Sequence, residues 1–225
     1  MSPDVNQLSS PPSRELPRGR HKLPPEAVRA SQRSRLLNAM LDCVAERGYG
    51  ATTVPAVVAH AGVSRSAFYA LFTDKIDCFL AVCDELATEI LDEISATTAP
   101  NWVDALRDGS RLYLRWWQER PAFSRTYFVE LPVAGPQAIE QRDRQYARFR
   151  ALFAQIAAWA RLQQPELPPL RPLATRIAVV AVTELIAEEV RAGRTKRLGE
   201  LEDELVYLIA TLLADEATAQ AAARR

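Results

Sequence analysis

Apolar residues recur at helical spacing just after the proline-rich start of the chain. Leu37, Met40, Leu41 and Val44 fall at i, i+3, i+4 and i+7, so the segment from Ser31 to about residue 48 has one apolar face. The first 25 residues contain six prolines and few large apolar side chains, a composition typical of a disordered arm. The pattern therefore predicts an arm followed by an amphipathic helix.

Two short helices separated by a glycine turn are predicted next. Thr53 is placed to cap a helix over 54–60, and Ser64 is placed to cap a second one over 65–72. Gly62 between them supplies the permissive backbone that a tight turn needs. A fourth, longer helix follows. Short helix, turn and short helix is the helix-turn-helix arrangement.

Prolines and glycines beyond residue 100 divide the rest of the chain into helical segments. No strand-like alternation of any length appears. We therefore predict an all-α fold, with a disordered basic arm over 1–30, a three-helix helix-turn-helix domain over 31–76 and a larger helical domain over 77–225. The fourth helix begins the larger domain and runs to about residue 92. The later segments are expected at 102–120, 121–131, 137–163, 172–192 and 198–214.

The last two predicted helices carry much apolar surface. The helix over 172–192 is apolar almost all round, so more than one side of it must be covered. In the final helix leucines recur at alternating steps of three and four, as in helices that pack at a shallow angle. These leucines are Leu198, Leu201, Leu205, Leu208 and Leu212. The seam fits either contact with a second copy of the chain or a core within one subunit.

The composition suits a folded protein whose N-terminal end faces a polyanion. Hydrophobic residues make up 48% of the 225 residues, enough for a packed core. The formal net charge is zero, yet between Arg14 and Lys75 ten basic residues stand against five acids. No apolar stretch reaches membrane-spanning length, and the N-terminus lacks the apolar centre of a signal peptide. We expect a cytoplasmic protein that does not enter a membrane.

Residues for catalysis or metal binding are few. Cys43, Cys78 and Cys83, with His21 and His60, show no metal-ligand spacing. We expect the cysteines to be small buried hydrophobes, with a redox sensor as the alternative. The sequence has no glycine-rich phosphate loop and no histidine-centred constellation. We therefore predict no enzyme activity, no metal and no cofactor.

One run of residues carries a specific resemblance. It consists of Gly48-Tyr49-Gly50-Ala51-Thr52-Thr53-Val54, then Ala61-Gly62-Val63-Ser64-Arg65-Ser66-Ala67-Phe68-Tyr69, then Phe72-Thr73-Asp74-Lys75. In order and spacing these pieces resemble the DNA-binding domain of the TetR family of transcriptional regulators. The resemblance implies a homodimer, in which the last two helices of each subunit form a four-helix bundle. It also implies a C-terminal domain that binds a small molecule and releases the DNA.

The residues of this run suit contact with DNA. Arg65, near the start of the predicted third helix, can pair with guanine and is the expected base reader, while its small neighbours Ser64, Ser66 and Ala67 allow close approach. Hydroxyl and ammonium groups suited to phosphate oxygens are carried by Thr52, Thr53, Tyr69 and Lys75. The alternative for Thr53 and Ser64 is that they serve only as helix caps.

The arm contains further candidate DNA contacts, and two positions of the run differ from the family pattern. Arg20 and Lys22 belong to a short basic stretch that can enter a narrow minor groove, so they are further candidate DNA contacts, with a solvated charge run as the alternative. Ala56 and Leu71 depart from the family pattern. Leu71 cannot hydrogen-bond a phosphate, so that contact is not carried over. Phe68 is expected in the core, together with Phe72.

Eleven of the seventeen aromatic residues lie between residues 102 and 159. They could line an apolar pocket with a few polar groups, the usual form of a small-molecule site, or form an ordinary core. The expected ligand-binding residues are Tyr113, Trp116, Phe123, Tyr127 and Phe128. The larger domain is accordingly expected to be a ligand-binding and dimerisation domain.

The predicted function is a ligand-responsive repressor. A single recognition helix reads only a few base pairs, so we expect a dimer on a near-palindromic double-stranded DNA operator. An unknown small, largely apolar effector is expected to release it. The alternative is a constitutive DNA-binding protein, or an activator, without a small-molecule ligand.

Overall fold

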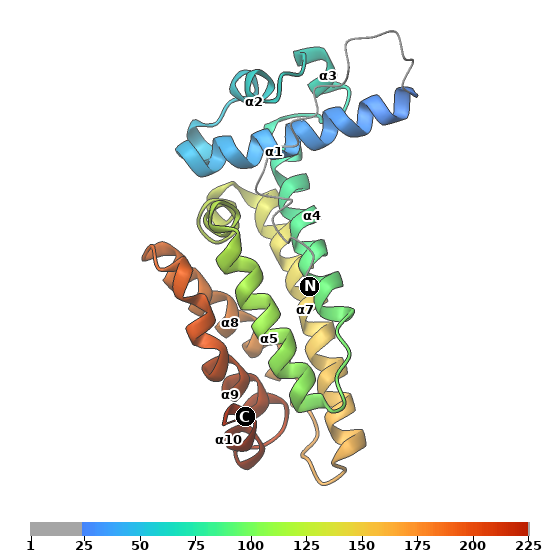
Figure 1. Cartoon of the computed structure of the whole chain (residues 1–225), viewed down its shortest axis with the longest axis vertical. Helices are drawn as coiled ribbons and strands as arrows, with labels where there is room; N and C mark the ends of the chain where they lie inside the picture. The colour runs from blue at the N-terminus through green and yellow to red at the C-terminus, as the bar shows by residue number, and fades with distance from the viewer. Residues whose placement is uncertain (1–23, 225) are drawn as a thin grey trace, which may run out of the picture. The chain divides into compact units, whose positions relative to one another are not determined.

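The computed structural model describes residues 24–224 and divides them into two compact units between Val82 and Cys83, inside helix α4 (Lys75–Ser95) (Figure 1). The first unit contains α1 (Pro25–Ala51), α2 (Val54–Ala61), α3 (Arg65–Tyr69) and the first turns of α4. Every regular element within the described residues is a helix, which confirms the all-α fold.

Helix α1 begins six residues before the predicted start at Ser31. Pro25 occupies its first turn, where a missing N–H costs nothing, and Glu26 there is favourable with the helix dipole. The predicted apolar face is buried at Leu37, Met40 and Val44. Gly48 interrupts the helix with a φ of 79°, and a last turn continues to Ala51.

Phe68 of α3 is the centre of the small core in the first unit. Its side chain is 0% exposed, and its ring lies 5.6 Å from that of Phe72, which is also buried. Both residues were predicted in the core, and this is confirmed. The cysteines are buried as expected; burial raises the pKa of Cys78 to about 12, which keeps the thiol protonated.

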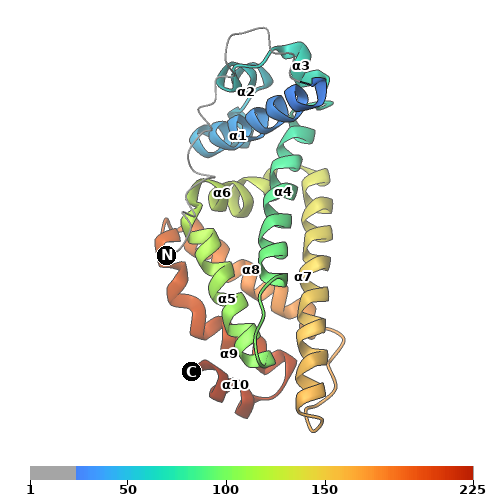
Figure 2. The ribbon, with the colours of Figure 1, turned by 45° about the vertical axis from the view of Figure 1, so that its right-hand side comes forward.

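Long helices form the body of the second unit (Figures 1 and 2). Helix α5 (Trp102–Glu119) contacts both α7 (Pro136–Gln163) and α9 (Glu202–Leu213), while α8 (Ala174–Arg191) contacts α7 and α9. Each of these helices therefore packs on at least two others, and the space between them is lined mainly by apolar side chains.

Two segments that were predicted as single helices, 121–131 and 198–214, are each divided into shorter elements. The first is α6 (Pro121–Arg125), a π-helical turn η1 (Thr126–Glu130) and a 3₁₀ turn η2 (Leu131–Val133). Pro132 has no N–H to continue a regular helix, which accounts for the tighter turn. The second begins with a 3₁₀ segment η3 (Thr195–Leu201) before α9. An unpredicted helix α10 (Glu216–Ala223) follows, capped by Asp215, whose carboxylate accepts from the backbone N–H of Thr218 at 2.7 Å.

A half-buried arginine, Arg107, ties the last helices of the described residues to the body of the second unit. Arg107 of α5 donates to Glu202 and Asp203 of α9 at 2.8 and 2.9 Å. It also donates to the backbone carbonyl of Ala222 in α10 at 2.8 Å. Because a paired guanidinium fixes three helices at once, α9 and α10 are held against α5.

The leucine seam of the last predicted helix is divided between two environments. Leu198 and Leu205 are 0% and 1% exposed within the single chain. Leu208 and Leu212 are only half-buried. The alternative of a core within one subunit therefore holds for Leu198 and Leu205, because α5 and α8 of the same chain pack on η3 and α9.

Truncating the central phenylalanine tests this account of the first unit. We expect Phe68→Ala to lower the unfolding free energy of residues 25–82 by about 3–5 kcal/mol, because a fully buried ring leaves a cavity. Hydrogen exchange of the amides in that segment measures it. Its neighbour Tyr69 is 48% exposed, so Tyr69→Ala is the control and should change stability by no more than about 0.5 kcal/mol. Equal losses in the two variants would contradict the assignment.

Candidate functional site

The turn between α2 and α3 is fixed by glycine and arginine. Gly62 adopts a left-handed conformation, with φ 59° and ψ 38°, which a side chain would strain. A Cβ there would also lie 2.8 Å from the guanidinium of Arg35. That guanidinium donates to the backbone carbonyl of Ala61 at 2.9 Å and to that of Gly62, so it satisfies the carbonyls at the end of α2.

Both predicted caps are present. The Thr53 hydroxyl accepts from the N–H of Ala56 at 3.4 Å, and the Ser64 hydroxyl accepts from the N–H of Ala67 at 3.1 Å. Thr53 and Ser64 are nevertheless exposed, so capping leaves each hydroxyl at the surface. The Ser64 hydroxyl also lies 3.0 Å from that of Ser66.

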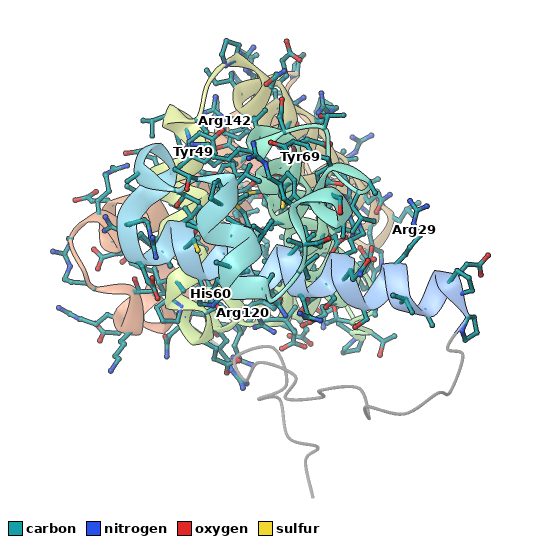
Figure 3. All side chains as sticks on the ribbon, turned by 90° about the horizontal axis from the view of Figure 1, so that it is seen from above. Arg29, Tyr49, His60, Tyr69, Arg120 and Arg142 are labelled. Atoms are coloured by element: carbon teal, nitrogen blue, oxygen red, sulfur yellow. The ribbon has the colours of Figure 1, made fainter. Side chains whose placement is uncertain are left out.

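Helix α3 turns one face to the core and the other outward. Phe68 points inward, whereas Arg65, Ser66 and Tyr69 are exposed and Ala67 is half-buried. The Arg65 guanidinium lies 5.7 Å from the centroid of the Tyr69 ring. Figure 3 marks Tyr69 on this helix. The exposed face thus presents a cation, hydroxyl groups and small side chains, the chemistry expected of a surface that enters a DNA groove.

Thr52 and Lys75 make contacts within the protein. Thr52 is 1% exposed, and its hydroxyl donates to the carbonyl of Gly48 at 2.8 Å. Lys75 donates to the carbonyl of Tyr49 at 2.9 Å, and its ammonium lies 4.0 Å from the Tyr49 ring centroid. Burial lowers the pKa of Lys75. The two side chains therefore hold the end of α1. Arg20 and Lys22, the candidates in the arm, lie outside the described residues.

The second unit contains a cavity of about 50 Å³. Its walls come from α4, α5, α7, α8 and α9, with Tyr127 from η1. Twelve of the seventeen lining residues are apolar. The other five carry hydroxyl groups: Ser110, Tyr113, Tyr127, Tyr146 and Thr183. Burial raises the pKa of the three tyrosines, so their phenols remain neutral.

Two of the five predicted ligand-binding residues, Tyr113 and Tyr127, line this cavity. The other three pack around Trp117 instead: Phe123 stacks on it at 5.1 Å between ring centroids, Phe128 lies at 4.6 Å and Trp116 at 5.0 Å. Those three form an aromatic core beside the cavity. Four residues of the α7 wall repeat at helical spacing: Tyr146, Phe149, Phe153 and Ile156. The three aromatic ones belong to the eleven that could line a pocket, but none was among the five expected ligand-binding residues.

A buried glutamine fixes the hydroxyl of Tyr127. The phenol donates to Oε1 of Gln145 at 2.7 Å. The Gln145 amide nitrogen is in turn 3.3 Å from the carbonyl of Cys83 and 3.5 Å from the Asp84 carboxylate, both on α4. Because Gln145 is 1% exposed, water does not compete for these bonds.

The described residues hold neither a metal-binding cluster nor a candidate membrane span. Within residues 24–224, no group of His, Cys, Asp and Glu side chains is arranged to hold a metal ion. No described helix combines the length and apolar character needed to cross a bilayer.

Comparison with known proteins agrees with the geometry of the first unit. The family of bacterial regulatory proteins called tetR matches residues 36–82, which include α2, the turn and α3. None of the curated proteins matches the chain.

Solved structures share the fold over most of the chain. The fatty acid degradation regulator FadR from Bacillus halodurans matches with a TM-score of 0.72 and 16% identity, over 81% of this chain and 94% of that one. FadR from Bacillus subtilis, in complex with stearoyl-CoA, matches with a TM-score of 0.64 and 15% identity, over 81% of this chain and 98% of that one. A tetR-family regulatory protein from Rhodococcus RHA1 matches with a TM-score of 0.63 and 20% identity, over 80% of this chain and 96% of that one.

The exposed α3, its glycine turn and these matches define a helix-turn-helix DNA-binding transcriptional regulator. Residues 36–82 are the part of the chain that matches the tetR family of bacterial regulatory proteins. Members of this class are regulators and not enzymes.

Arg65 offers a direct test of base reading. We expect Arg65→Ala to weaken binding to the cognate operator by about 1–3 kcal/mol while barely changing affinity for random DNA, because a bidentate contact to a base is lost. Fluorescence anisotropy with both duplexes measures this. Arg47, exposed on α1 and paired with Glu46, provides the control Arg47→Ala. Equal losses on both DNAs would make Arg65 a phosphate contact instead.

Proposed function

We propose that this chain is a cytoplasmic, ligand-responsive repressor. As a homodimer it binds a near-palindromic DNA operator, and a small, largely apolar effector releases it. The observation that carries the proposal is that one chain combines an exposed recognition face on α3 with an apolar cavity in its second unit. The first feature suits sequence-specific DNA binding, and the second suits a small-molecule signal.

On DNA, α3 enters the major groove. Arg65 reads a base, and the small side chains beside it let the helix approach closely. Thr53 and Tyr69 face phosphate oxygens. Lys75 does so as well, through the N–H donors of its ammonium that are not bonded to the Tyr49 carbonyl. Thr52 contributes through the loop that it holds and not through its buried hydroxyl. Arg20 and Lys22 remain proposed contacts of the arm.

The dimer forms through the two helices α8 and α9. Apolar side chains lie exposed at helical spacing in and just before α8: Leu173, Ile177 and Val180 are 60%, 49% and 52% exposed. Isolated exposed apolar residues are common, but a stripe along one helix is the usual sign of an interface. The half-buried Leu208 and Leu212 on α9 complete the face in place of Leu198 and Leu205.

The effector occupies the cavity of the second unit. A coenzyme A thioester, like the stearoyl-CoA bound by the Bacillus subtilis FadR, carries phosphates that need cationic partners. The residues that line the cavity include no cation. The cavity is therefore better suited to a small apolar molecule than to such a ligand.

Selection of binding sites from random duplex DNA, followed by effector titration, tests this function. We expect purified protein to enrich a near-palindromic site and to dissociate from it when an effector found by thermal shift is added, because a ligand selective for the free conformation shifts the equilibrium. Arg65→Ala is the control for specific binding. Operator binding that no effector changes would indicate a constitutive DNA-binding protein, and tighter binding with effector would contradict release.

Charged residues on α8 test the dimer. We expect the double variant Ile177→Glu, Val180→Glu to be monomeric by light scattering, because charge at an apolar interface loses its hydration. Operator affinity should fall toward that for random DNA, roughly 10³-fold or more below specific binding. Leu162, 82% exposed on α7, supplies the control Leu162→Glu. A double variant that stays dimeric would place the interface elsewhere.

A further inference from the structure

The side chains that line the cavity restrict the charge of its occupant. Each is either apolar or carries a hydroxyl group. A carboxylate or ammonium placed there would lose its water without meeting an opposite charge, which is strongly unfavourable. Arg142 is close to the wall: it lies 5.3 Å from the ring centroid of Tyr146 and pairs with Asp143 at 3.5 Å, but it does not line the cavity.

The hydrogen bonds already made inside the protein restrict the polar group of the occupant. Tyr127 uses its hydrogen to donate to Gln145, and Thr183 uses its hydrogen to donate to the carbonyl of Val179 at 2.7 Å. A hydroxyl whose hydrogen is engaged still has lone pairs to offer. The Tyr127 oxygen therefore presents an acceptor to the cavity, and an occupant that brings a donor satisfies it, whereas the Thr183 hydroxyl also has the Tyr146 phenol as a hydrogen-bond partner.

Gln145 makes the acceptor at Tyr127 a fixed one. Its Oε1 accepts from the phenol, while its amide nitrogen faces the Cys83 carbonyl on α4. This orientation of the amide is imposed by the carbonyl, which can only accept. The Tyr127 hydrogen thus points to Gln145, and its lone pairs remain for the cavity. Gln145 is a positioning residue that does not itself line the cavity.

The volume restricts the size of the occupant. An apolar cavity of about 150 Å³ in another protein is sufficient for benzene. The cavity here is about a third of that, so a single ring already requires its lining side chains to shift. A compact molecule is favoured over a long one.

We propose that the cavity binds an uncharged, compact apolar molecule that carries a hydroxyl group, and that Tyr127 accepts the hydrogen bond from this hydroxyl. This assignment rests on the proposed function, because it names the chemical class of the effector. It distinguishes the site from one that binds a carboxylic acid or a coenzyme A thioester, since the carboxylate of the first and the phosphates of the second bring negative charge.

Three probes that share one ring and one ethyl group test the assignment. 4-Ethylphenol is neutral and donates, 4-ethylanisole is neutral without a donor, and 4-ethylbenzoate is an anion at neutral pH. Each is titrated calorimetrically into the full chain without DNA, so failure of effector-driven DNA release would leave the result intact. We expect 4-ethylphenol to bind roughly fivefold tighter than 4-ethylanisole, the value of one hydrogen bond. 4-Ethylbenzoate should bind at least roughly tenfold more weakly than 4-ethylphenol.

Removing one hydroxyl group locates the contact. In Tyr127→Phe the preference for 4-ethylphenol over 4-ethylanisole should disappear, with the melting temperature used to confirm folding. Tyr207→Phe makes the same change on α9, at a residue that does not line the cavity, and should keep the preference. The proposal is overturned if 4-ethylbenzoate binds as tightly as 4-ethylphenol, which would implicate Arg142, or if none of the probes binds. A preference that survives in Tyr127→Phe also overturns it.

Discussion

The recognition helix α3 depends on contacts outside itself. Five residues provide too few internal hydrogen bonds to keep a helix in water, because nucleation costs more than one turn returns. Burial of Phe68, the Ser64 cap and the left-handed Gly62 supply what is missing. The same contacts fix its orientation: with Phe68 held inside, Arg65 lies on the exposed side. DNA recognition in this protein therefore depends on a small core.

The aromatic side chains of the second unit lie in two environments. Phe123 and Phe128 pack around Trp117 in a core of ring-to-ring contacts. Phe149 and Phe153 line the cavity together with three tyrosines. Among these tyrosines, Tyr127 donates to Gln145, which offsets the cost of burying its phenol. The cavity is thus apolar but able to recognise one polar group.

Several features of the sequence were sufficient for prediction because their causes are local. A glycine in a turn and a hydroxyl at a helix start act within a few residues, and Gly62, Thr53 and Ser64 behave as expected. Local signals failed where neighbouring segments compete. The stretch after α6 becomes a π-helical turn and then a 3₁₀ turn. Helix α10 follows α9, although no helix was predicted after residue 214.

The sequence alone determined the helical fold, the helix-turn-helix, the family resemblance and the buried position of Phe68. Periodicity, caps and glycine turns depend only on residues that are close together in the sequence. Only the tertiary structure decided which side chains reach the same space. It buried Thr52, engaged Lys75 with Tyr49, turned Trp116 away from the cavity and put Leu205 in the core of one subunit. The physical reason is that a helix has several faces. The face that meets a neighbour is set by packing between segments far apart in the chain, which no local pattern records.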